Sequence, residues 1–511
     1  MLVKLYSAAL QGVDATEVEV EVNHTEKDQF RMSIVGLPDA AVRESSQRVL
    51  SAIQNSALKF GAGINTVNLA PADLKKEGPS FDLPIAIASA AVGMQEDIPS
   101  SEQYCLVGEL ALDGSLRPVK GVISIALEAR KQGRTKLIVP IANADEAAVV
   151  DGIEVYGMES LYDTWHLMTG QRAFAPHFLD RQKFFNAQRT YLEDLSDVKG
   201  QMQVKRALEV AAAGGHNMLM VGPPGTGKSM IAKRLPTILP DMSEEEAIET
   251  TKIHSIAGRL RDESFLVTRP FRAPHHTISD AGLLGGGVNP GPGEVSLAHH
   301  GVLFLDELPE FRRQTLEVLR QPLEDRYVTI SRAAGSITFP SKCLLVAAMN
   351  PCPCGYYGDT KRECRCSPIQ IEKYRQRISG PLLDRIDLHV EVPLIEYKEL
   401  HSGDGGEKSD VIRDRVIEAR NRQQHRYQEH KGVNCNASIP SRLMQEHCKI
   451  DAETSSYLEQ VMGELNFSAR AHDRILKVAR TLADLEDSAN IQMQHLLEAV
   501  QYRTLDRKLL M

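Results

Sequence analysis

Eight consecutive residues have the composition of a phosphate-binding loop. In order they are Gly222, Pro223, Pro224, Gly225, Thr226, Gly227, Lys228 and Ser229. Glycines let backbone N–H groups turn toward phosphate oxygens, a lysine at this place reaches the β- and γ-phosphates, and the serine hydroxyl binds Mg²⁺. The octapeptide therefore predicts an ATP site in which Lys228 neutralises phosphate charge and Ser229 is a magnesium ligand.

Two carboxylates, Asp306 and Glu307, follow the apolar residues 302–305. One carboxylate beside a phosphate loop can hold Mg²⁺, and a second can orient or polarise the attacking water. We therefore expect Asp306 to bind the same magnesium ion as Ser229, and we expect Glu307 to act on the water.

Asn350 closes another apolar run, residues 343–349. On a strand beside the phosphate loop, its amide could position the hydrolytic water. The alternative is a structural asparagine that begins a turn before Pro351.

The predicted chemistry requires a parallel sheet that brings these loops together. Residues 217–221, 302–305 and 343–349 are short apolar runs, as expected of strands buried on both faces, and residues 230–235 continue from the phosphate loop as a helix. A strand, the glycine loop and a helix thus follow one another, which is the context that the motif needs. A chance glycine turn would lack that context.

Length and composition limit the remaining choices. The 511-residue chain carries a net charge of −9, with 42% hydrophobic and 25% charged residues. It is too long for one hydrophobic core, so about three domains are expected. The negative charge argues weakly against nucleic-acid binding, although a ring protein can confine its basic residues to a pore. Residues 1–6 lack a signal-peptide core and the apolar run 83–94 is too short to span a bilayer, so we expect a cytoplasmic protein.

Changes in periodicity divide the chain into five predicted ranges. They are an α/β domain at 1–168, a linker at 169–190, the nucleotide-binding α/β domain at 191–397, a glycine-rich linker at 398–409 and a helical domain at 410–511. The predicted fold class is therefore α/β with a C-terminal helical domain. Within the first range we expect a strand at 16–22, a helix at 39–58 and a hairpin around Asp113 and Gly114.

Arg385 stands among residues 380–388, downstream of Asn350. An arginine at this place would reach the γ-phosphate held by a neighbouring subunit and neutralise charge in the transition state. The alternative is an ordinary salt bridge with Asp384 or Asp387.

Arg470 follows Ser468, which is a suitable N-cap for a helix in the last domain. From that helix Arg470 could reach the phosphates, and Arg474 is a second choice. Arginines are common on helix surfaces, so the alternative for both is a solvent-exposed position without a role.

In this order the motifs resemble those of AAA+ ATPases, specifically the magnesium-chelatase-like group that is related to MCM helicases. The resemblance covers residues 190–505 and, with the N-terminal domain included, extends to the ComM/YifB proteins. It implies that Asn350 is sensor 1, that Arg385 is the arginine finger and that Arg470 is sensor 2. It also implies that the segment 197–201, with Val198 in it, packs against the adenine.

The family role that this resemblance implies is ATP-driven DNA branch migration during natural transformation. Residues 326–331 and 336–339 alternate like a hairpin with Arg332 at its tip. The resemblance implies that this hairpin enters a ring pore and that Arg332 contacts DNA; a plain solvent-facing turn is the alternative. The glycine-rich residues 280–293 resemble a second pore loop. Residues 272–276 before them could add a phosphate contact, and the alternative for the pair His275 and His276 is a structural role.

Four cysteines lie between Asn350 and Arg385, and they are Cys352, Cys354, Cys364 and Cys366. Four thiolates gathered by a short loop would bind Zn²⁺ in a tetrahedron. The two C-x-C pairs are tighter than the usual zinc-binding spacing, and the cluster resembles one in ComM proteins. Reduced thiols and redox pairs are the alternatives.

Residues 76–80 and 107–119 are similar to the proteolytic domain of Lon, a ribosomal S5-like α/β fold. Lon uses a Ser–Lys dyad in which the amine deprotonates the hydroxyl. Ser80 matches the serine, but the lysine position holds Ile125, and an aliphatic side chain cannot act as a base. We expect a non-proteolytic domain that contacts DNA or stabilises a ring, in which Ser80 is a turn or capping serine.

Three functions remain open. The first is a ring-forming, ATP-driven DNA motor, a helicase or translocase that acts on branched recombination intermediates. The second is a magnesium-chelatase-type motor subunit for metal insertion, and the third is an ATP-dependent protease. An arginine finger acts between subunits, so we expect a closed homo-oligomer, by resemblance a hexamer, that holds DNA in its pore and uses ATP and Mg²⁺.

Overall fold

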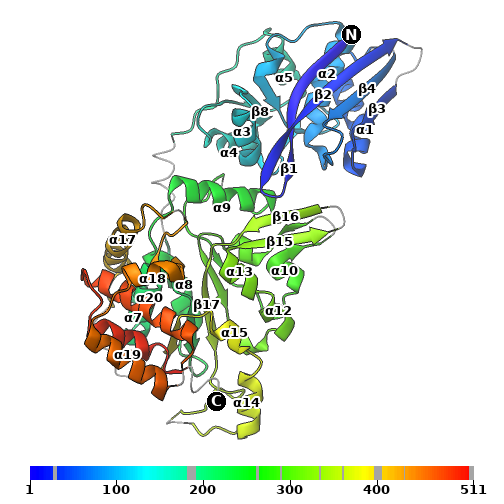
Figure 1. The fold of residues 1–511 in the computed structure, drawn as a ribbon. Helices are drawn as coiled ribbons and strands as arrows, with labels where there is room; N and C mark the ends of the chain where they lie inside the picture. Colours follow the sequence, from blue (N-terminus) through cyan, green and yellow to red (C-terminus); the bar gives the residue numbers. More distant parts are fainter. Residues whose placement is uncertain are drawn as a thin grey trace. The chain divides into compact units, whose positions relative to one another are not determined.

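The computed structural model describes residues 1–26, 31–61, 63–180, 191–260, 264–287, 290–332, 335–359, 362–395, 406–430, 432–465 and 467–505, and for residues 332 and 335 it describes the backbone alone. The chain divides into two compact units (Figure 1). The first comprises Met1–Gln188 and Glu244–Val267, and the second comprises Arg189–Ser243 and Thr268–Met511. Each unit has a hydrophobic core of its own.

A seven-stranded mixed sheet forms the centre of the first unit. In spatial order its strands are β3 (Arg31–Val35), β4 (Gly63–Ala70), β2 (Asp14–Glu26), β1 (Leu2–Gln11), β5 (Tyr104–Leu106), β8 (Lys136–Pro140) and β9 (Glu154–Met158). β2 pairs antiparallel with β1 and β4, and the remaining pairs are parallel. β2 confirms the strand predicted at 16–22, because Val18, Val20 and Val22 share one buried face.

Helices and a small hairpin complete this first unit. The helices that follow the sheet strands are α1 (Ala40–Asn55), α2 (Asp82–Met94), α3 (Val122–Lys131), α4 (Ala144–Ala148) and α5 (Leu161–Met168). α1 confirms the helix predicted at 39–58, and the Asp39 carboxylate caps it by accepting from the Val42 N–H at 2.8 Å. β6 (Glu109–Leu110) and β7 (Leu116–Arg117) pair antiparallel and confirm the predicted hairpin.

α2 explains the apolar run at 83–94. Residues 82–92 of this helix are all buried, so it has no polar face to present to water. Within the described residues, no helix is both long and apolar enough to cross a lipid bilayer.

Helix α9 (Glu244–Ile256) returns to the first unit from the middle of the chain. The Ser255 hydroxyl accepts a hydrogen bond from the Gly121 N–H at 2.7 Å and donates one to the Glu146 carboxylate at 2.5 Å. All three residues are buried. The domain predicted at 191–397 contains α9, so within that range the chain leaves the nucleotide-binding unit, packs on the first unit and returns.

The second unit is built on a five-stranded parallel sheet. In spatial order its strands are β11 (Phe271–Arg272), β14 (Val302–Leu305), β17 (Leu344–Met349), β10 (Met218–Val221) and β18 (Leu388–Glu391). Helix α8 (Lys228–Ile238) packs on β14 and β17, and α7 (Met202–Gly214) packs on β18. Every residue of β10, β14 and β17 is buried, which explains their uninterrupted apolar sequences.

Helices make up the described part of the C-terminal region, as predicted. They are α17 (Ser409–Arg426), α18 (Ser441–His447), α19 (Ala452–Glu464), α20 (Ala469–Leu485) and α21 (Met493–Gln501). Ser468 is the N-cap of α20, because its hydroxyl accepts from the Ala471 N–H at 3.2 Å. Apolar side chains of these helices share one core with the parallel sheet, so the two parts form a single unit.

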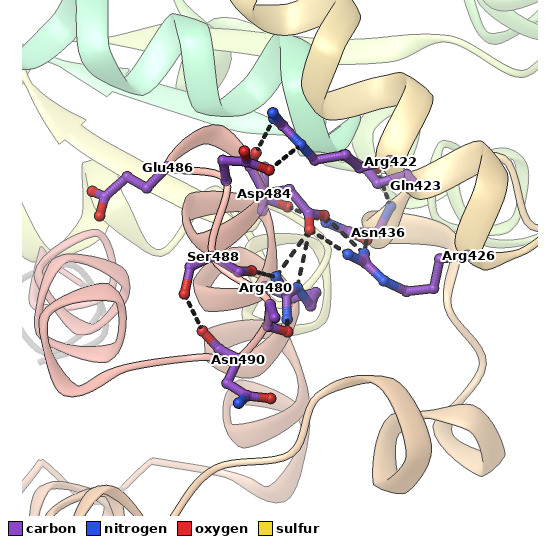
Figure 2. A network of polar contacts seen from close by, with 12 residues as sticks. Arg422, Gln423, Arg426, Asn436, Arg480, Asp484, Glu486, Ser488 and Asn490 are labelled. Atoms are coloured by element: carbon purple, nitrogen blue, oxygen red, sulfur yellow. Dashed lines mark hydrogen bonds and ion pairs between the residues drawn. The ribbon is translucent and has the colours of Figure 1, made fainter.

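A buried polar network ties the C-terminal helices together (Figure 2). The Asp484 carboxylate accepts hydrogen bonds from Arg426 at 2.9 Å, from Arg480 at 3.2 Å and from the Asn436 amide at 2.8 Å. Asn436 also donates to Thr481 at 3.0 Å. Each buried charge has an opposite charge and further hydrogen bonds, which is the condition under which a buried ion pair is tolerated.

Candidate active site

The site lies at the carboxyl edge of the parallel sheet. β14, β17 and β10 are adjacent and parallel, so the loops that leave their carboxyl ends emerge at one edge. Residues 222–229 follow β10, Asp306 and Glu307 follow β14, and Asn350 follows β17. The sheet topology thus brings together three motifs that are far apart in the sequence.

Glycines in the phosphate loop meet two different physical requirements. A Cβ atom at Gly222 would lie 2.2 Å from the Val392 carbonyl oxygen. The backbone at Val392 therefore leaves no room for a side chain at Gly222. Gly225 and Gly227 have φ angles of 80° and 82°, in the left-handed region that other residues rarely adopt. Gly227 is also the N-cap residue of α8, which places the first helical N–H groups at the loop.

Lys228 is held inside the loop that it follows. Its ammonium donates hydrogen bonds to the carbonyl oxygens of Gly222 at 2.7 Å and Pro223 at 2.8 Å, and to the Asn350 amide oxygen at 3.2 Å. The residue is only 8% exposed. Burial lowers the pKa of Lys228, while the charges of Asp306 and Glu307 act in the opposite direction. The lysine and Asn350, predicted from separate motifs, are therefore in direct contact.

Ser229 and Asp306, the two residues predicted to bind magnesium, are in direct contact. The Ser229 hydroxyl donates to the Asp306 carboxylate at 2.6 Å. A hydroxyl and a carboxylate side by side offer the hard oxygen donors that Mg²⁺ prefers, and neighbouring positions are left for water and phosphate oxygens. The residues present fit the ion that the sequence predicts.

Glu307 differs from Asp306 in its surroundings. Its backbone is left-handed, with a φ angle of 51°, and its N–H donates to Asp306 at 2.9 Å. The Glu307 side chain is 54% exposed and lies 3.3 Å from the His276 ring nitrogen. Asp306 is therefore held by the loop, whereas Glu307 is accessible to water. Residues 272–276 are a possible phosphate contact by sequence. In the structure Arg272 pairs with Glu294 at 2.6 Å and His276 lies beside Glu307.

Gln201 is the last residue of the segment that the resemblance places against the adenine. Its side-chain amide donates to the carbonyl oxygens of Thr226 at 2.9 Å and Pro393 at 3.2 Å. Val198, the predicted adenine contact, lies three residues earlier and is fully buried in the core of the second unit. Gln201 thus connects the segment of Val198 to the phosphate loop.

Arg385 does not make either of the salt bridges considered for it. Its guanidinium donates to the Pro381 carbonyl at 2.7 Å and pairs with Glu324, and the side chain is 14% exposed. Asp387 is buried and is bound instead by Arg474 and by His216, at 3.0 Å from the latter.

Arg470 and Arg474 have different environments on α20. Arg474 is engaged with Asp387, whereas Arg470 is 67% exposed and its nearest acid is Asp384 at 3.9 Å. Arg470 is therefore the freer of the two to reach a ligand.

The hairpin predicted after residue 325 is present. β15 (Tyr327–Arg332) and β16 (Gly335–Pro340) are antiparallel, with Arg332 opposite Gly335 at the tip. The Arg332 side chain lies outside the described residues. The glycine-rich segment 280–293 forms α10 (Asp280–Leu284) followed by the short strands β12 (Gly285–Gly286) and β13 (Gly291–Pro292).

The four cysteines converge. The sulfur of Cys352 lies 3.3 Å from that of Cys354 and 3.7 Å from that of Cys364, and all four sulfurs, including Cys366, lie within 4.8 Å of one another. A tetrahedral zinc with Zn–S bonds of ~2.3 Å separates its sulfurs by ~3.8 Å. The cluster fits that ion, and the cysteines are free thiols rather than disulfides.

The protease-like residues of the first unit are not arranged as a catalytic dyad. Ile125 is 1% exposed within α3, so the position expected to hold a lysine belongs to the core. Ser80 lies in the single 3₁₀ turn Pro79–Phe81 that leads into α2, and its carbonyl accepts from the Gly108 N–H at 2.9 Å.

Family models cover most of the chain. "Magnesium chelatase, subunit ChlI" matches residues 194–400, "Subunit ChlI of Mg-chelatase" matches residues 18–143, and "Magnesium chelatase, subunit ChlI C-terminal" matches residues 406–503. These matches assign both the α/β regions and the C-terminal helices to one group of proteins.

Two relatives match this chain over nearly its full length, and one matches a part of it. The chain is 46% identical over 511 residues to the uncharacterized protein YifB of Escherichia coli strain K12, covering 99% of this chain and 98% of that protein. It is 45% identical over 507 residues to the competence protein ComM of Haemophilus influenzae, with coverage of 99% and 98%. Lon protease 2 of Thermus thermophilus is 28% identical over 144 residues, 27% of this chain and 17% of that protein. The chain belongs to the ComM/YifB family of magnesium-chelatase-like AAA+ ATPases, and its N-terminal α/β region resembles Lon.

Proposed function

We propose that this protein is a ring-forming motor that uses ATP hydrolysis to move branched DNA. The observation that carries the proposal is the meeting of Lys228, the Ser229–Asp306 pair and Asn350 at one sheet edge, with Glu307 beside them. In this proposal Lys228 and the loop bind the phosphates, and Ser229 and Asp306 hold Mg²⁺. That ion, when bound, neutralises charge on the phosphate oxygens.

The hydrolytic step is assigned to side chains that can reach a water molecule. Glu307 accepts the proton of, or orients, the attacking water, and Asn350 positions it. The segment 197–201, which contains Val198, packs against the adenine. Arg470 reaches the phosphates from its own subunit.

Arg385 completes the site from a neighbouring subunit in this proposal. Its guanidinium would exchange Glu324 for the γ-phosphate of the adjacent protomer, where it stabilises charge in the transition state. Such a shared site requires a closed homo-oligomer, and a hexamer is the state that we propose. The proposed location is the cytoplasm.

The DNA part of the proposal rests on the similarity to a protein named for competence. We propose that the β15–β16 hairpin lies in the ring pore and that Arg332 contacts DNA phosphates. The non-proteolytic first unit would contact DNA or stabilise the ring.

An ATPase assay with single-stranded, duplex and branched DNA tests the motor function. We expect DNA to stimulate hydrolysis, the stimulation to fall steeply with salt as phosphate contacts do, and the protein to move three- and four-way junctions. Particle sizing with ATP should show a closed ring. Hydrolysis indifferent to every DNA, together with immobile junctions, would refute the motor.

The four cysteines are proposed to hold a structural Zn²⁺. Their convergence supports this assignment, and metal analysis of the purified protein tests it. About one zinc per chain is expected, and Cys354→Ser should abolish it.

A metal-insertion motor is the second candidate, because the matching family models are named for magnesium chelatase. Porphyrin metallation with the appropriate partner subunits would favour it over the DNA motor. An ATP-dependent protease is the third, and casein degradation that Ser80→Ala abolishes would support it. The buried Ile125 argues against proteolysis.

A further inference from the structure

Residues 352–355, which include Cys352 and Cys354, form a turn that contacts the phosphate loop. Gly355 follows Cys354 and has a φ angle of 87°. A Cβ atom at Gly355 would lie 2.6 Å from the Cδ atom of Pro224, a ring atom of the phosphate loop. Two segments more than a hundred residues apart in the sequence are therefore packed backbone against ring, with no space for a side chain between them.

The cysteines themselves build this turn. The Gly355 N–H donates to the Cys352 carbonyl at 3.0 Å, and the Cys352 side chain is fully buried. Asn350, which contacts Lys228, lies only two residues before Cys352. A shift of the turn would therefore reach the phosphate loop by two routes, through Pro224 and through Asn350.

The other two cysteines, Cys364 and Cys366, come directly before a helix. Helix α14 (Pro368–Arg375) begins after Cys366, with Ser367 as its N-cap. Its last residue, Arg375, lies over the Tyr357 ring at 5.2 Å and donates to the Pro351 carbonyl at 3.5 Å. The four thiols thus lie where the turn meets the segment that leads into α14. A metal ion bound by all four would hold the turn and that segment together.

We propose that the four-cysteine centre acts as a buttress for the phosphate loop, so that Zn²⁺ on the thiolates raises the affinity of the chain for ATP. The inference rests on the proposed ATP site and is independent of the DNA motor. Its physical basis is preorganisation: a loop held in its binding position by packing and metal ligation loses less freedom when the nucleotide arrives.

Two glycines of this segment offer a matched comparison. Gly355 and Gly358 both have left-handed backbones, with φ angles of 87° and 81°, but a Cβ atom at Gly358 meets nothing within 4 Å. Both alanine variants pay the same backbone strain, and only Gly355→Ala pushes on Pro224. The measurement is binding of a fluorescent ATP analogue to full-length protein, with the zinc content determined on the same samples.

We expect Gly355→Ala to keep its zinc and to bind the analogue about tenfold more weakly, the size of one lost hydrogen bond to a charged group. Gly358→Ala should match the wild type in both respects. Cys354→Ser should lose the zinc and weaken binding by a similar factor. Wild-type protein stripped of zinc by a chelator should bind more weakly, and added Zn²⁺ should restore it.

Several results would overturn the inference. One is a zinc-loaded Gly355→Ala protein that binds the analogue as tightly as Gly358→Ala. Another is zinc removal that leaves the affinity of the wild type unchanged, and a third is a wild type that takes up no zinc. If Cys354→Ser fails to fold, the chelator-treated wild type still tests the effect of zinc, and the glycine pair still tests the contact with Pro224. Wild-type protein that binds no ATP would instead refute the ATP site, and the inference with it.

Discussion

Two adjacent acidic residues have different partners at the ATP site. Asp306 accepts from the Ser229 hydroxyl and from the backbone N–H of Glu307, so its carboxylate is fixed beside the proposed magnesium position. The carboxylate of Glu307 is half exposed and has His276 beside it. Substitution of Glu307 should therefore alter chemistry while leaving the fold and the nucleotide-binding groups in place.

The first prediction concerns Glu307→Gln. The amide cannot accept a proton from water, so kcat should fall by about 10²–10³, the usual contribution of a general base. The affinity for ATP should stay within about twofold, because the phosphate-binding groups are intact. Phosphate release and binding of a fluorescent ATP analogue measure the two quantities. Glu310→Gln is the control, since Glu310 is paired with Arg377. A kcat within tenfold of the wild type would contradict the assigned role.

Local sequence patterns predicted the strands and helices that surround the candidate site. The strands β10, β14 and β17 were visible as apolar runs, and the Ser468 cap fixed the start of α20. These features depend on residues close in sequence, whose periodicity and capping chemistry act directly on the backbone. Because these strands were expected to be parallel, Lys228, Asp306 and Asn350 were expected at one edge of the sheet.

Contacts between residues far apart in the sequence could not be predicted from the sequence. Asp387 was considered as a partner of Arg385, yet it binds His216 and Arg474, which are far from it along the chain. The return of α9 to the first unit likewise depends on a buried contact between Ser255 and Glu146. No periodicity encodes such a contact, because many acids and hydroxyls could satisfy the same chemistry.

The second prediction concerns Asp387→Asn. This change leaves the Arg474 guanidinium without its buried anion, and the free energy of unfolding should fall by about 3–5 kcal/mol near neutral pH. Burial alone would raise the pKa of Asp387, but Arg474 and His216 outweigh it and hold the pKa below the usual range. A carboxylate with a lowered folded pKa stabilises the protein above its unfolded pKa of ~4, and this stability is lost as the pH falls.

Thermal unfolding of Asp387→Asn and wild type across a pH series checks both points. The gap between the two proteins should be widest near pH ~7 and should narrow below pH ~4. Asp384→Asn is the matched control: its carboxylate is 3.9 Å from Arg470, so a loss under about 1 kcal/mol is expected. A pH-independent gap would show that charge on Asp387 is not what stabilises this part of the fold.

The third prediction concerns the attachment of α9. Ser255→Ala removes one donor to Glu146, whose carboxylate still accepts from Asn143 at 3.1 Å, and it removes the acceptor for the buried Gly121 N–H. Leaving the Gly121 N–H unsatisfied should cost about 1–3 kcal/mol and loosen α9 from the rest of the first unit. Hydrogen exchange of residues 244–256 should accelerate relative to wild type. Lys252→Ala, which breaks only a surface pair with Asp14, is the control. Equal protection in Ser255→Ala and wild type would contradict the buried contact.

The role proposed for Arg385 determines whether one chain can be a complete enzyme. Arg385 is occupied within its own chain by Glu324 and Pro381. The proposed role requires it to serve the ATP held by another protomer. Glu307, by contrast, lies next to Asp306 and the phosphate loop of its own chain. In that proposal the two residues of one chain belong to different composite sites, and a mixing experiment can separate them.

The fourth prediction is that two inactive variants restore activity to each other. Glu307→Gln and Arg385→Ala should each hydrolyse ATP about 10²-fold or more slowly than wild type. In a mixed ring, an Arg385→Ala subunit with an intact Glu307 can receive Arg385 from a Glu307→Gln neighbour, so a fraction of the sites becomes complete. Phosphate release should rise when the two proteins are mixed, and it should depend on total concentration as assembly does. A double variant mixed with either single variant should gain nothing, because one of the two residues is then missing from every subunit. If the mixtures stay as inactive as their components, Arg385 acts on the ATP of its own chain. The shared site would then be refuted, and so would the ring that it requires.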